Sequence, residues 1–159
     1  MKKIKVFAPA SIANLGCGFD VMGMALDEVG DVLEMTLDES GSGITIFNDT
    51  DVPLPTDPED NVVTPVIRKF FAMTGHSGGV EVRIVKKIYP GSGIGSSAAS
   101  SAAAAFGINE LFGAPYTSAS VSIPIYIIGR SRPSCLSSIQ RITGTTECIN
   151  DLSFMRCAP

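Results

Sequence analysis

The segment from Pro90 to Ser100 concentrates the residues of this chain that are best suited to bind a ligand. It reads PGSGIGSSAAS, with three alternating glycines followed by two adjacent serines. Glycines lack the Cβ atoms that would hold a phosphate away from the backbone. Serine hydroxyls can bond a phosphate oxygen or ligate a metal ion. The pattern therefore predicts a phosphate site built from Gly91, Gly93, Gly95, Ser96 and Ser97.

The elements on either side of this segment are the ones that an anion site needs. Before it, Val80, Val82 and Ile84 alternate with other residues and predict a half-buried strand. After it, the alanine-rich stretch from Ala98 to Leu111 has high helix propensity. The first N–H groups of a helix lack intrahelical partners, and the helix dipole places positive charge there. A strand, a glycine-rich turn and a helix start in this order favour binding of a phosphate.

Two familiar phosphate motifs do not match the segment. A Walker A loop ends in Gly-Lys-Ser/Thr, and this loop has no lysine. A dinucleotide-binding fingerprint counted from Gly91 and Gly93 requires a glycine where Ser96 stands. A glycine-rich connection that binds nothing is the alternative, and the glycine spacing alone does not decide between them.

The doubled serine and the alanine run resemble the phosphate loop of the GHMP kinases, which phosphorylate galactose, homoserine, mevalonate and phosphomevalonate. Residues 8–23, APASIANLGCGFDVMG, resemble the amino-terminal signature of the homoserine kinases within that family. Residues 57–63, DPEDNVV, and 109–113, NELFG, also resemble that group at their expected places. The resemblance covers about residues 3–115. It implies an α+β fold, the ribosomal protein S5 domain 2-like amino-terminal domain of GHMP kinases, present here in incomplete form.

The resemblance also implies roles for individual residues. Ser97 would ligate Mg²⁺ and take part in catalysis, and Asn61 would make an adenine-side contact with ATP. The loop residues implied to bind the nucleotide are Pro90, Gly91, Ser92, Gly93, Ile94, Gly95, Ser96, Ser97, Ala98, Ala99 and Ser100.

A second candidate site lies in the glycine-bearing stretch from Ser11 to Asp20. Asn14 offers an amide and Asp20 a carboxylate, and a buried substrate ammonium needs a carboxylate partner. By resemblance, Asn14 and Asp20 would bind the amino-acid substrate, and Asp20 could instead act as a catalytic base for the attacking hydroxyl. Taken without the resemblance, both residues are better explained as caps of turns.

The activity implied by the resemblance is transfer of the ATP γ-phosphate to the hydroxyl of L-homoserine, giving O-phospho-L-homoserine for threonine biosynthesis. Another small-molecule kinase of the same family, or a nucleotide-binding fragment without turnover, are the alternatives. The cofactors would be ATP and Mg²⁺. The family is often dimeric, so a homodimer is compatible with the resemblance.

Composition agrees with a cytoplasmic enzyme and excludes other classes. The 159 residues carry a net charge of −4 and no basic stretch, which argues against binding of nucleic acid. No apolar run approaches the roughly 20 residues that span a bilayer, so no membrane partner is expected. The four cysteines form no Cys-x-x-Cys pair, which favours free thiols over zinc or disulfides.

The remaining pattern predicts the other elements of the domain. Residues 3–8 alternate as a strand, and residues 9–20 read as a loop. Strands over 31–37 and 44–47 are expected to form a hairpin around the turn at 40–43. A helix is expected to follow with an apolar face at Val62, Val66 and Phe70, capped by Thr64 or Asp60 and ending at Gly75.

The chain changes character after residue 115. Residues 116–159 hold three of the four cysteines and eight serines, and all four of their basic residues are arginine. A kinase of this family is expected to continue with an acidic metal ligand, a histidine-bearing stretch and a second glycine-rich segment. We therefore divide the chain into a kinase amino-terminal domain, 1–115, and a poorly structured tail, 116–159, from a shifted reading frame or a foreign sequence. We expect this 159-residue chain by itself to be inactive.

Overall fold

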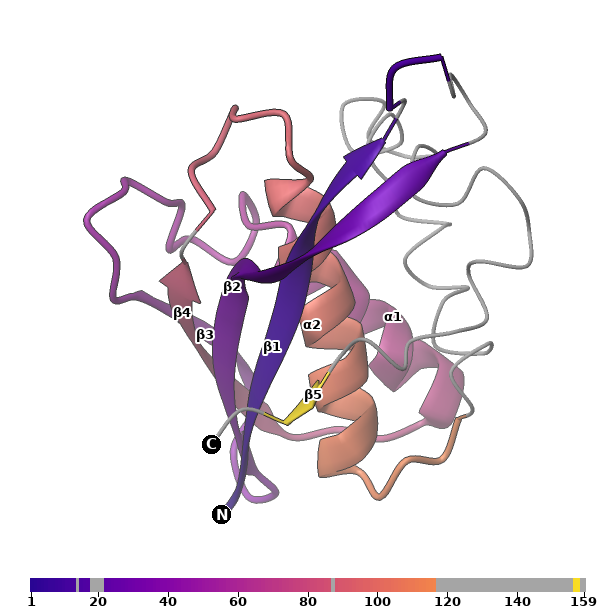
Figure 1. Cartoon of the computed structure of the whole chain (residues 1–159). Coiled ribbons are helices and arrows are strands. Elements are labelled where there is room, and N and C mark those ends of the chain that lie inside the picture. The colour runs from indigo at the N-terminus through magenta and orange to yellow at the C-terminus, as the bar shows by residue number, and fades with distance from the viewer. Residues whose placement is uncertain (14, 18–21, 87, 117–155, 158–159) are drawn as a thin grey trace.

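The computed structural model describes residues 1–13, 15–17, 22–86, 88–116 and 156–157. These residues form one sheet, in the order β3-β4-β2-β1-β5, with helices α1 and α2 packed beside it (Figure 1). The expected α+β class is confirmed. The elements are β1 (Lys2–Ala13), β2 (Gly23–Asp38), β3 (Gly43–Asn48), α1 (Val63–Thr74), β4 (Gly79–Lys86), α2 (Ser96–Leu111) and β5 (Arg156–Cys157).

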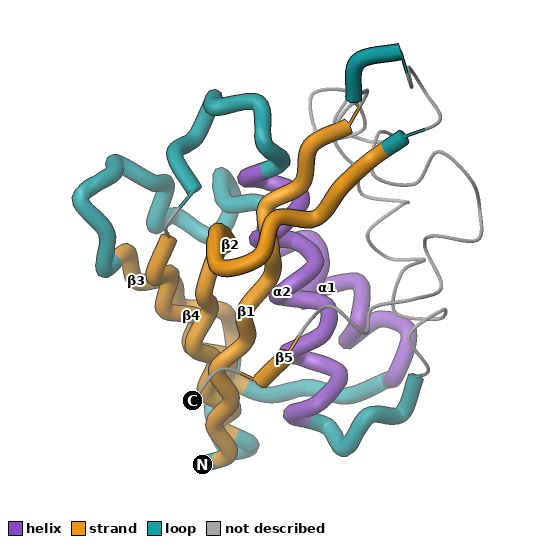
Figure 2. The backbone as a smooth tube through the Cα atoms, viewed as in Figure 1, coloured by secondary structure: helices purple, strands orange, loops and turns teal. Residues whose placement is uncertain are grey.

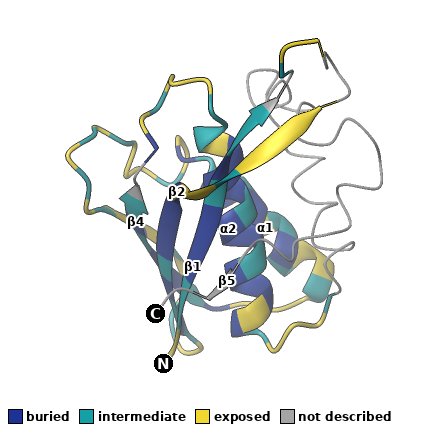
Figure 3. Cartoon of the chain, in the orientation of Figure 1, coloured by how far each residue is buried: buried dark blue, intermediate teal, exposed yellow. Residues whose placement is uncertain are grey.

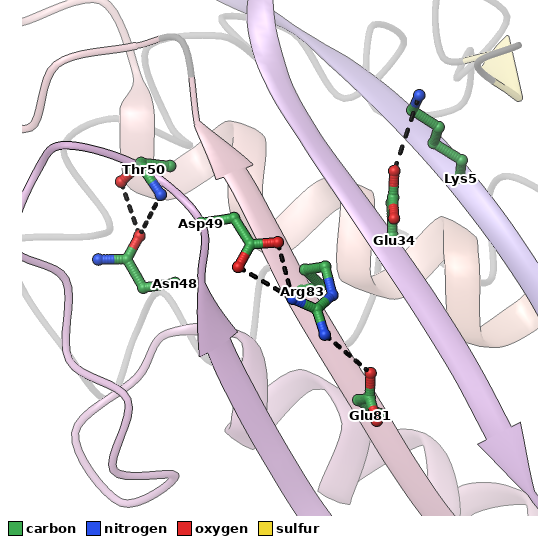
Figure 4. Close-up of polar contacts among 7 residues, drawn as sticks. All are labelled: Lys5, Glu34, Asn48, Asp49, Thr50, Glu81 and Arg83. Atoms are coloured by element: carbon green, nitrogen blue, oxygen red, sulfur yellow. Dashed lines mark hydrogen bonds and ion pairs between the residues drawn. The ribbon is translucent and has the colours of Figure 1, made fainter.

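Alternation along the strands separates a buried face of the sheet from a charged one. Ile4, Met35 and Val82 are cross-strand neighbours on the face that the helices cover. At the adjacent position on each strand, Lys5, Glu34 and Arg83 form the matching row on the other face. Figure 4 shows this charged row, in which Lys5 Nζ lies 3.7 Å from Glu34 Oε1. The period of two along each strand therefore places the core on the helix side.

Helix α2 lies against β1 and β2, and α1 packs against α2 (Figure 2). Most of α2 is buried, and its buried residues are mainly small, including Ala103, Ala104 and Gly107. A Cβ built on Gly107 would lie 2.5 Å from Met35 Sδ, so an alanine at this position would require the Met35 side chain to move. A helix that is apolar on most sides is stable only when it is covered in this way.

The strand and helix predicted around the glycine-rich segment are both confirmed, as β4 and α2, although α2 begins two residues earlier, at Ser96. The end of α1 at Gly75 is confirmed too: Gly75 is left-handed, with φ +70°, and its N–H donates to the Phe71 carbonyl at 2.9 Å. The predicted caps are wrong. Val62 occupies the cap position without a side-chain bond, and Asn61 Oδ1 instead accepts from the Val63 N–H at 3.1 Å.

The predicted hairpin between β2 and β3 is wrong, although the turn between them exists. Strand β4 lies between β2 and β3, antiparallel to β2 and parallel to β3. At the turn, a Cβ on Gly79 would lie only 3.2 Å from the Gly41 Cα. Residues 39–42 therefore pack against the start of β4, which lies between the two strands that they connect.

The predicted loop over 9–20 is wrong in its first part, because β1 continues to Ala13. The pairing with β2 shifts after Pro9, from Pro9 opposite Gly30 to Ser11 opposite Ala25. Proline donates no hydrogen bond to a ladder and is tolerated at such irregularities. Beyond the shift, β1 and β2 form the arm whose β2 side is largely exposed in Figure 3.

Three smaller features complete the description of the fold. Among the described residues, no helix is long and apolar enough to cross a membrane. Cys17 is an exposed free thiol. Within the predicted tail, Arg156 and Cys157 form β5, which pairs with β1 at Val6 and Phe7.

Candidate functional site

The connection from β4 to α2 contains three glycines in the left-handed conformation. Gly91, Gly93 and Gly95 have φ values of +83°, +80° and +78°. Residues with a Cβ pay roughly 1–2 kcal/mol to adopt this conformation. Each of the three glycines therefore occupies a position where the backbone conformation favours glycine. A connection without a special conformation would not need glycine at these positions.

The space around these glycines differs along the loop. A Cβ built on Gly91 or Gly93 would meet no atom within 4 Å, so this part of the loop faces open space. A Cβ on Gly95 would lie 2.6 Å from Ser11 Oγ. The Ser11 N–H also donates to the Ile94 carbonyl at 3.0 Å. The loop is thus open at its tip and held against β1 at its end.

Helix α2 begins immediately after Gly95. The Gly95 carbonyl accepts the first helical bond, from the Ala99 N–H at 2.9 Å. Ser97 in the first turn is exposed, as is Ser92 in the loop. A partly exposed helix start, preceded by an open glycine loop, is a suitable cradle for phosphate.

The last three residues predicted to bind nucleotide lie in the interior. Ala98, Ala99 and Ser100 are buried in the first turns of α2. Ser100 Oγ donates to Asp31 Oδ2 at 2.7 Å and lies 3.3 Å from the Ser96 carbonyl oxygen. Their side chains pack in the core next to the loop. A contact of these residues with a ligand stays a prediction.

The structure places Asn61 at the start of α1, where it is 4% exposed. Its Nδ2 donates to the Pro55 carbonyl at 2.6 Å, and its Oδ1 accepts from Val63. Both ends of this amide order the chain that enters α1. The predicted adenine-side contact stays a prediction.

Asn14 and Asp20 lie outside the described residues, so their predicted contacts with substrate stay predictions. The described residues on either side locate the start of this stretch. The Leu15 N–H donates to the Met22 carbonyl at 3.4 Å. Ser11, which precedes the stretch on β1, contacts the glycine-rich loop directly. The segment carrying Asn14 and Asp20 therefore starts beside the predicted phosphate site.

Two residues that contact the loop or its flanks are missed by reasoning from sequence. The pattern places Ser11 in a loop and gives Asp31 as the first residue of an ordinary strand. Asp31 is fully buried, and its Oδ1 accepts from the Ile88 N–H at 3.3 Å. A charged residue within an otherwise buried strand segment is the available signal, because a buried carboxylate needs partners.

The described residues contain no group of three or more His, Cys, Asp or Glu side chains able to hold a metal ion. Mg²⁺ is commonly bound by one or two protein oxygens together with substrate phosphates and water. The exposed hydroxyl of Ser97 beside the open loop fits that kind of site better than an all-protein cage.

Comparison with known proteins identifies the family that the sequence resembles. The family model for the GHMP kinases N terminal domain matches residues 61–132, which include the glycine-rich loop. A homoserine kinase from Methanococcus vannielii is 44% identical over 113 residues, covering 70% of this chain and 37% of that relative. The chain therefore spans little more than a third of the length of this relative.

Solved structures agree at the level of the fold. The crystal structure of homoserine kinase from Cytophaga hutchinsonii is 30% identical, with a TM-score of 0.76, over 99% of this chain and 52% of that one. A mevalonate kinase from Methanococcus jannaschii is 15% identical, with a TM-score of 0.63, over 81% of this chain and 46% of that one, and supports the fold alone. By sequence and by fold, this chain belongs to the GHMP kinase family and carries its amino-terminal portion.

Proposed function

We propose that this chain is the amino-terminal part of a homoserine kinase, which transfers the γ-phosphate of ATP to the hydroxyl of L-homoserine. The observation that carries the proposal is the run of left-handed glycines at 91, 93 and 95, immediately before the start of α2. The 44% identity with the Methanococcus vannielii homoserine kinase favours homoserine over other small alcohols.

In this proposal the loop binds the phosphates of ATP. Backbone N–H groups between Gly93 and Ser97 donate to the β- and γ-phosphates, and the helix dipole adds positive potential. The open space around Gly91 and Gly93 lets the phosphates reach the backbone. Phosphoryl transfer depends mainly on such positioning and charge stabilisation, because the protein does little covalent chemistry.

Ser97 is the residue that we assign to the metal. Its hydroxyl is exposed in the first turn of α2, beside the proposed phosphate positions. Bound Mg²⁺ would supply charge neutralisation at the transferred phosphoryl group. Ser97 thereby orients the reacting end of the nucleotide.

Asn14 and Asp20 are the residues that we assign to homoserine. The Asp20 carboxylate would pair with the substrate ammonium, and the Asn14 amide would bond a polar group of the substrate. The support for this placement is the contact of Ser11 with the glycine-rich loop, because the stretch that begins there starts beside the phosphates. The hydroxyl to be phosphorylated would then lie between the two loops.

The test uses a chimera, because the chain spans only 37% of the Methanococcus vannielii enzyme. Residues 1–115 replace the corresponding segment of that enzyme, and ADP release is measured with homoserine and with mevalonate. We expect turnover with homoserine and none above background with mevalonate. A soluble, ATP-binding chimera that prefers mevalonate, or that turns over neither alcohol, would contradict the assignment.

The variant Asp20→Asn in the same chimera tests the substrate site. It keeps the size of the side chain and removes its charge. Losing one partner of a desolvated charge pair costs about 2–5 kcal/mol, which corresponds to roughly thirtyfold or more in affinity. The KM for homoserine should rise by that factor while the KM for ATP stays the same. Unchanged homoserine kinetics would make Asp20 a turn residue only.

A further inference from the structure

We infer that Asp31 is a positioning residue that holds the phosphate loop in its binding conformation. The inference rests on the proposed function only in its first step, that the loop binds ATP. It does not depend on which alcohol is phosphorylated.

Asp31 lies where β2 is paired with a strand on either side. It lies in the central strand β2, opposite Ala8 of β1 on one side and Lys86 of β4 on the other. It is fully buried. The backbone that carries this carboxylate is therefore fixed by strand pairing on both sides.

Two of the contacts of Asp31 bracket the loop in sequence. Oδ1 accepts from the backbone N–H of Ile88, two residues after the end of β4. Oδ2 accepts from Ser100 Oγ, in the first turns of α2. These partners lie 57 and 69 residues away along the chain. A single carboxylate thus joins the entrance and the exit of the loop to the sheet.

Between these two points, Ser11 holds the loop at Ile94 and Gly95, and the tip of the loop is open. Gly91 and Gly93 would have no neighbour within 4 Å of a Cβ, and glycine has the largest conformational freedom of any residue. A loop that must become ordered on binding loses affinity in proportion to the freedom it gives up. Fixing both ends beforehand shortens the segment whose freedom is lost.

A role in packing alone would not explain a carboxylate at this position. A buried charge is costly unless it is paired and hydrogen-bonded, and apolar residues of similar volume are often as stabilising. Nearby residues of β2 on the buried face, such as Leu33 and Met35, are apolar. The polar contacts that Asp31 makes include both flanks of the phosphate loop, which points to loop geometry as its role.

The experiment measures ATP affinity by calorimetry and amide exchange over residues 89–98, in the 159-residue chain. Asp31→Ala removes the carboxylate, and Ser100→Ala removes one of its partners. Ser101→Ala is the matched control for the latter, because Ser101 is equally buried in the same helix and its hydroxyl has no hydrogen-bond partner among the described residues. Leu33→Ala is the control for lost stability in β2.

We expect Asp31→Ala to weaken ATP binding about tenfold and to speed exchange in the loop. Ser100→Ala should do the same to a smaller degree, and the double variant should be no weaker than Asp31→Ala alone, because both break one contact. Asp31→Asn, which retains an acceptor for Ile88, should recover most of the affinity. Ser101→Ala and Leu33→Ala should leave affinity and loop exchange unchanged.

Three results would overturn the inference. One is unchanged affinity and loop exchange in folded Asp31→Ala. If that variant does not fold, a Ser100→Ala variant that binds ATP as tightly as Ser101→Ala and the parent overturns the inference equally. An equal loss in Leu33→Ala would assign the effect to stability. A parent chain that binds no ATP would instead remove the phosphate site itself, which distinguishes failure of the proposed function from failure of the role of Asp31.

Discussion

Replacing Gly95 by alanine is the most direct perturbation of the proposed phosphate loop, because two separate penalties act at this position. Gly95 has φ +78° and ψ +28°, which costs an alanine about 1–2 kcal/mol. The new Cβ would also lie 2.6 Å from Ser11 Oγ, so the serine must leave its position. An off-rotamer side chain costs about 0.5–1.5 kcal/mol.

The two penalties together amount to about 1.5–3.5 kcal/mol, or roughly tenfold to a few hundredfold in affinity at 1.4 kcal/mol per factor of ten. The free loop can relax the strain by changing conformation, but it must return to the strained conformation to bind phosphate. The loss should therefore appear in the Kd for ATP more than in the free energy of unfolding.

Gly91→Ala is the matched control, because Gly91 has φ +83° but no neighbour within 4 Å of a Cβ. Calorimetry should give Gly91→Ala a loss of only about 5–30-fold, from the backbone penalty alone. The double variant Ser11→Ala/Gly95→Ala should recover to the level of Gly91→Ala. Parent-like ATP affinity in folded Gly95→Ala would refute the assignment of the loop, and failure of Ser11→Ala to relieve the loss would refute the role given to Ser11.

Three further predictions concern the frame around the site. Gly107→Ala should destabilise the chain in urea by about 1–3 kcal/mol through overpacking against Met35, whereas a gain in stability would mean that helix propensity outweighs the close contact. Hydrogen bonding to Arg68, with charge attraction second, lowers the pKa of Glu59 below its usual 4.5. The Glu59 carboxylate therefore stabilises the fold above pH 4.5, and this contribution is lost as the pH falls through the lowered pKa. The difference in stability between the parent and Glu59→Gln should disappear at that pH, and a constant difference down to acid pH would contradict the assignment. If residues 116–159 form a tail outside the kinase domain, a chain ending at Tyr116 should keep its near-ultraviolet circular dichroism and ATP affinity, and loss of either would show that the later residues, including β5 on β1, belong to the domain.

Much of the local structure was predictable because it depends on neighbours in sequence. The alternation of Val80, Val82 and Ile84 indicated β4, and the alanine run indicated α2. The glycines at 91, 93 and 95 indicated a backbone that side chains would not tolerate, and all three are left-handed. Such preferences act within a few residues and are visible without a partner.

The domain boundary predicted after residue 115 stays a prediction, because composition alone does not decide where packing ends. The change in composition after residue 115 suggested that Tyr116 begins a tail. In the structure the Tyr116 N–H donates to Asn109 Oδ1 at 3.1 Å, and its ring packs edge-on against Phe70 at 6.0 Å between centroids. The family match also extends to residue 132. Composition reports the chemistry of a segment, whereas its packing depends on residues elsewhere.

By itself, the sequence determined the order strand, glycine-rich loop and helix, and the residue types that could bind phosphate there. Only the tertiary structure decided that β4 lies between β2 and β3, that Ser11 contacts Gly95, and that Asp31 joins Ile88 to Ser100. Asp31 lies 57 and 69 positions from its two partners, and Ser11 lies 84 positions from Gly95. Their free energy depends on how whole strands and helices fit together in one core, which no window of local sequence contains.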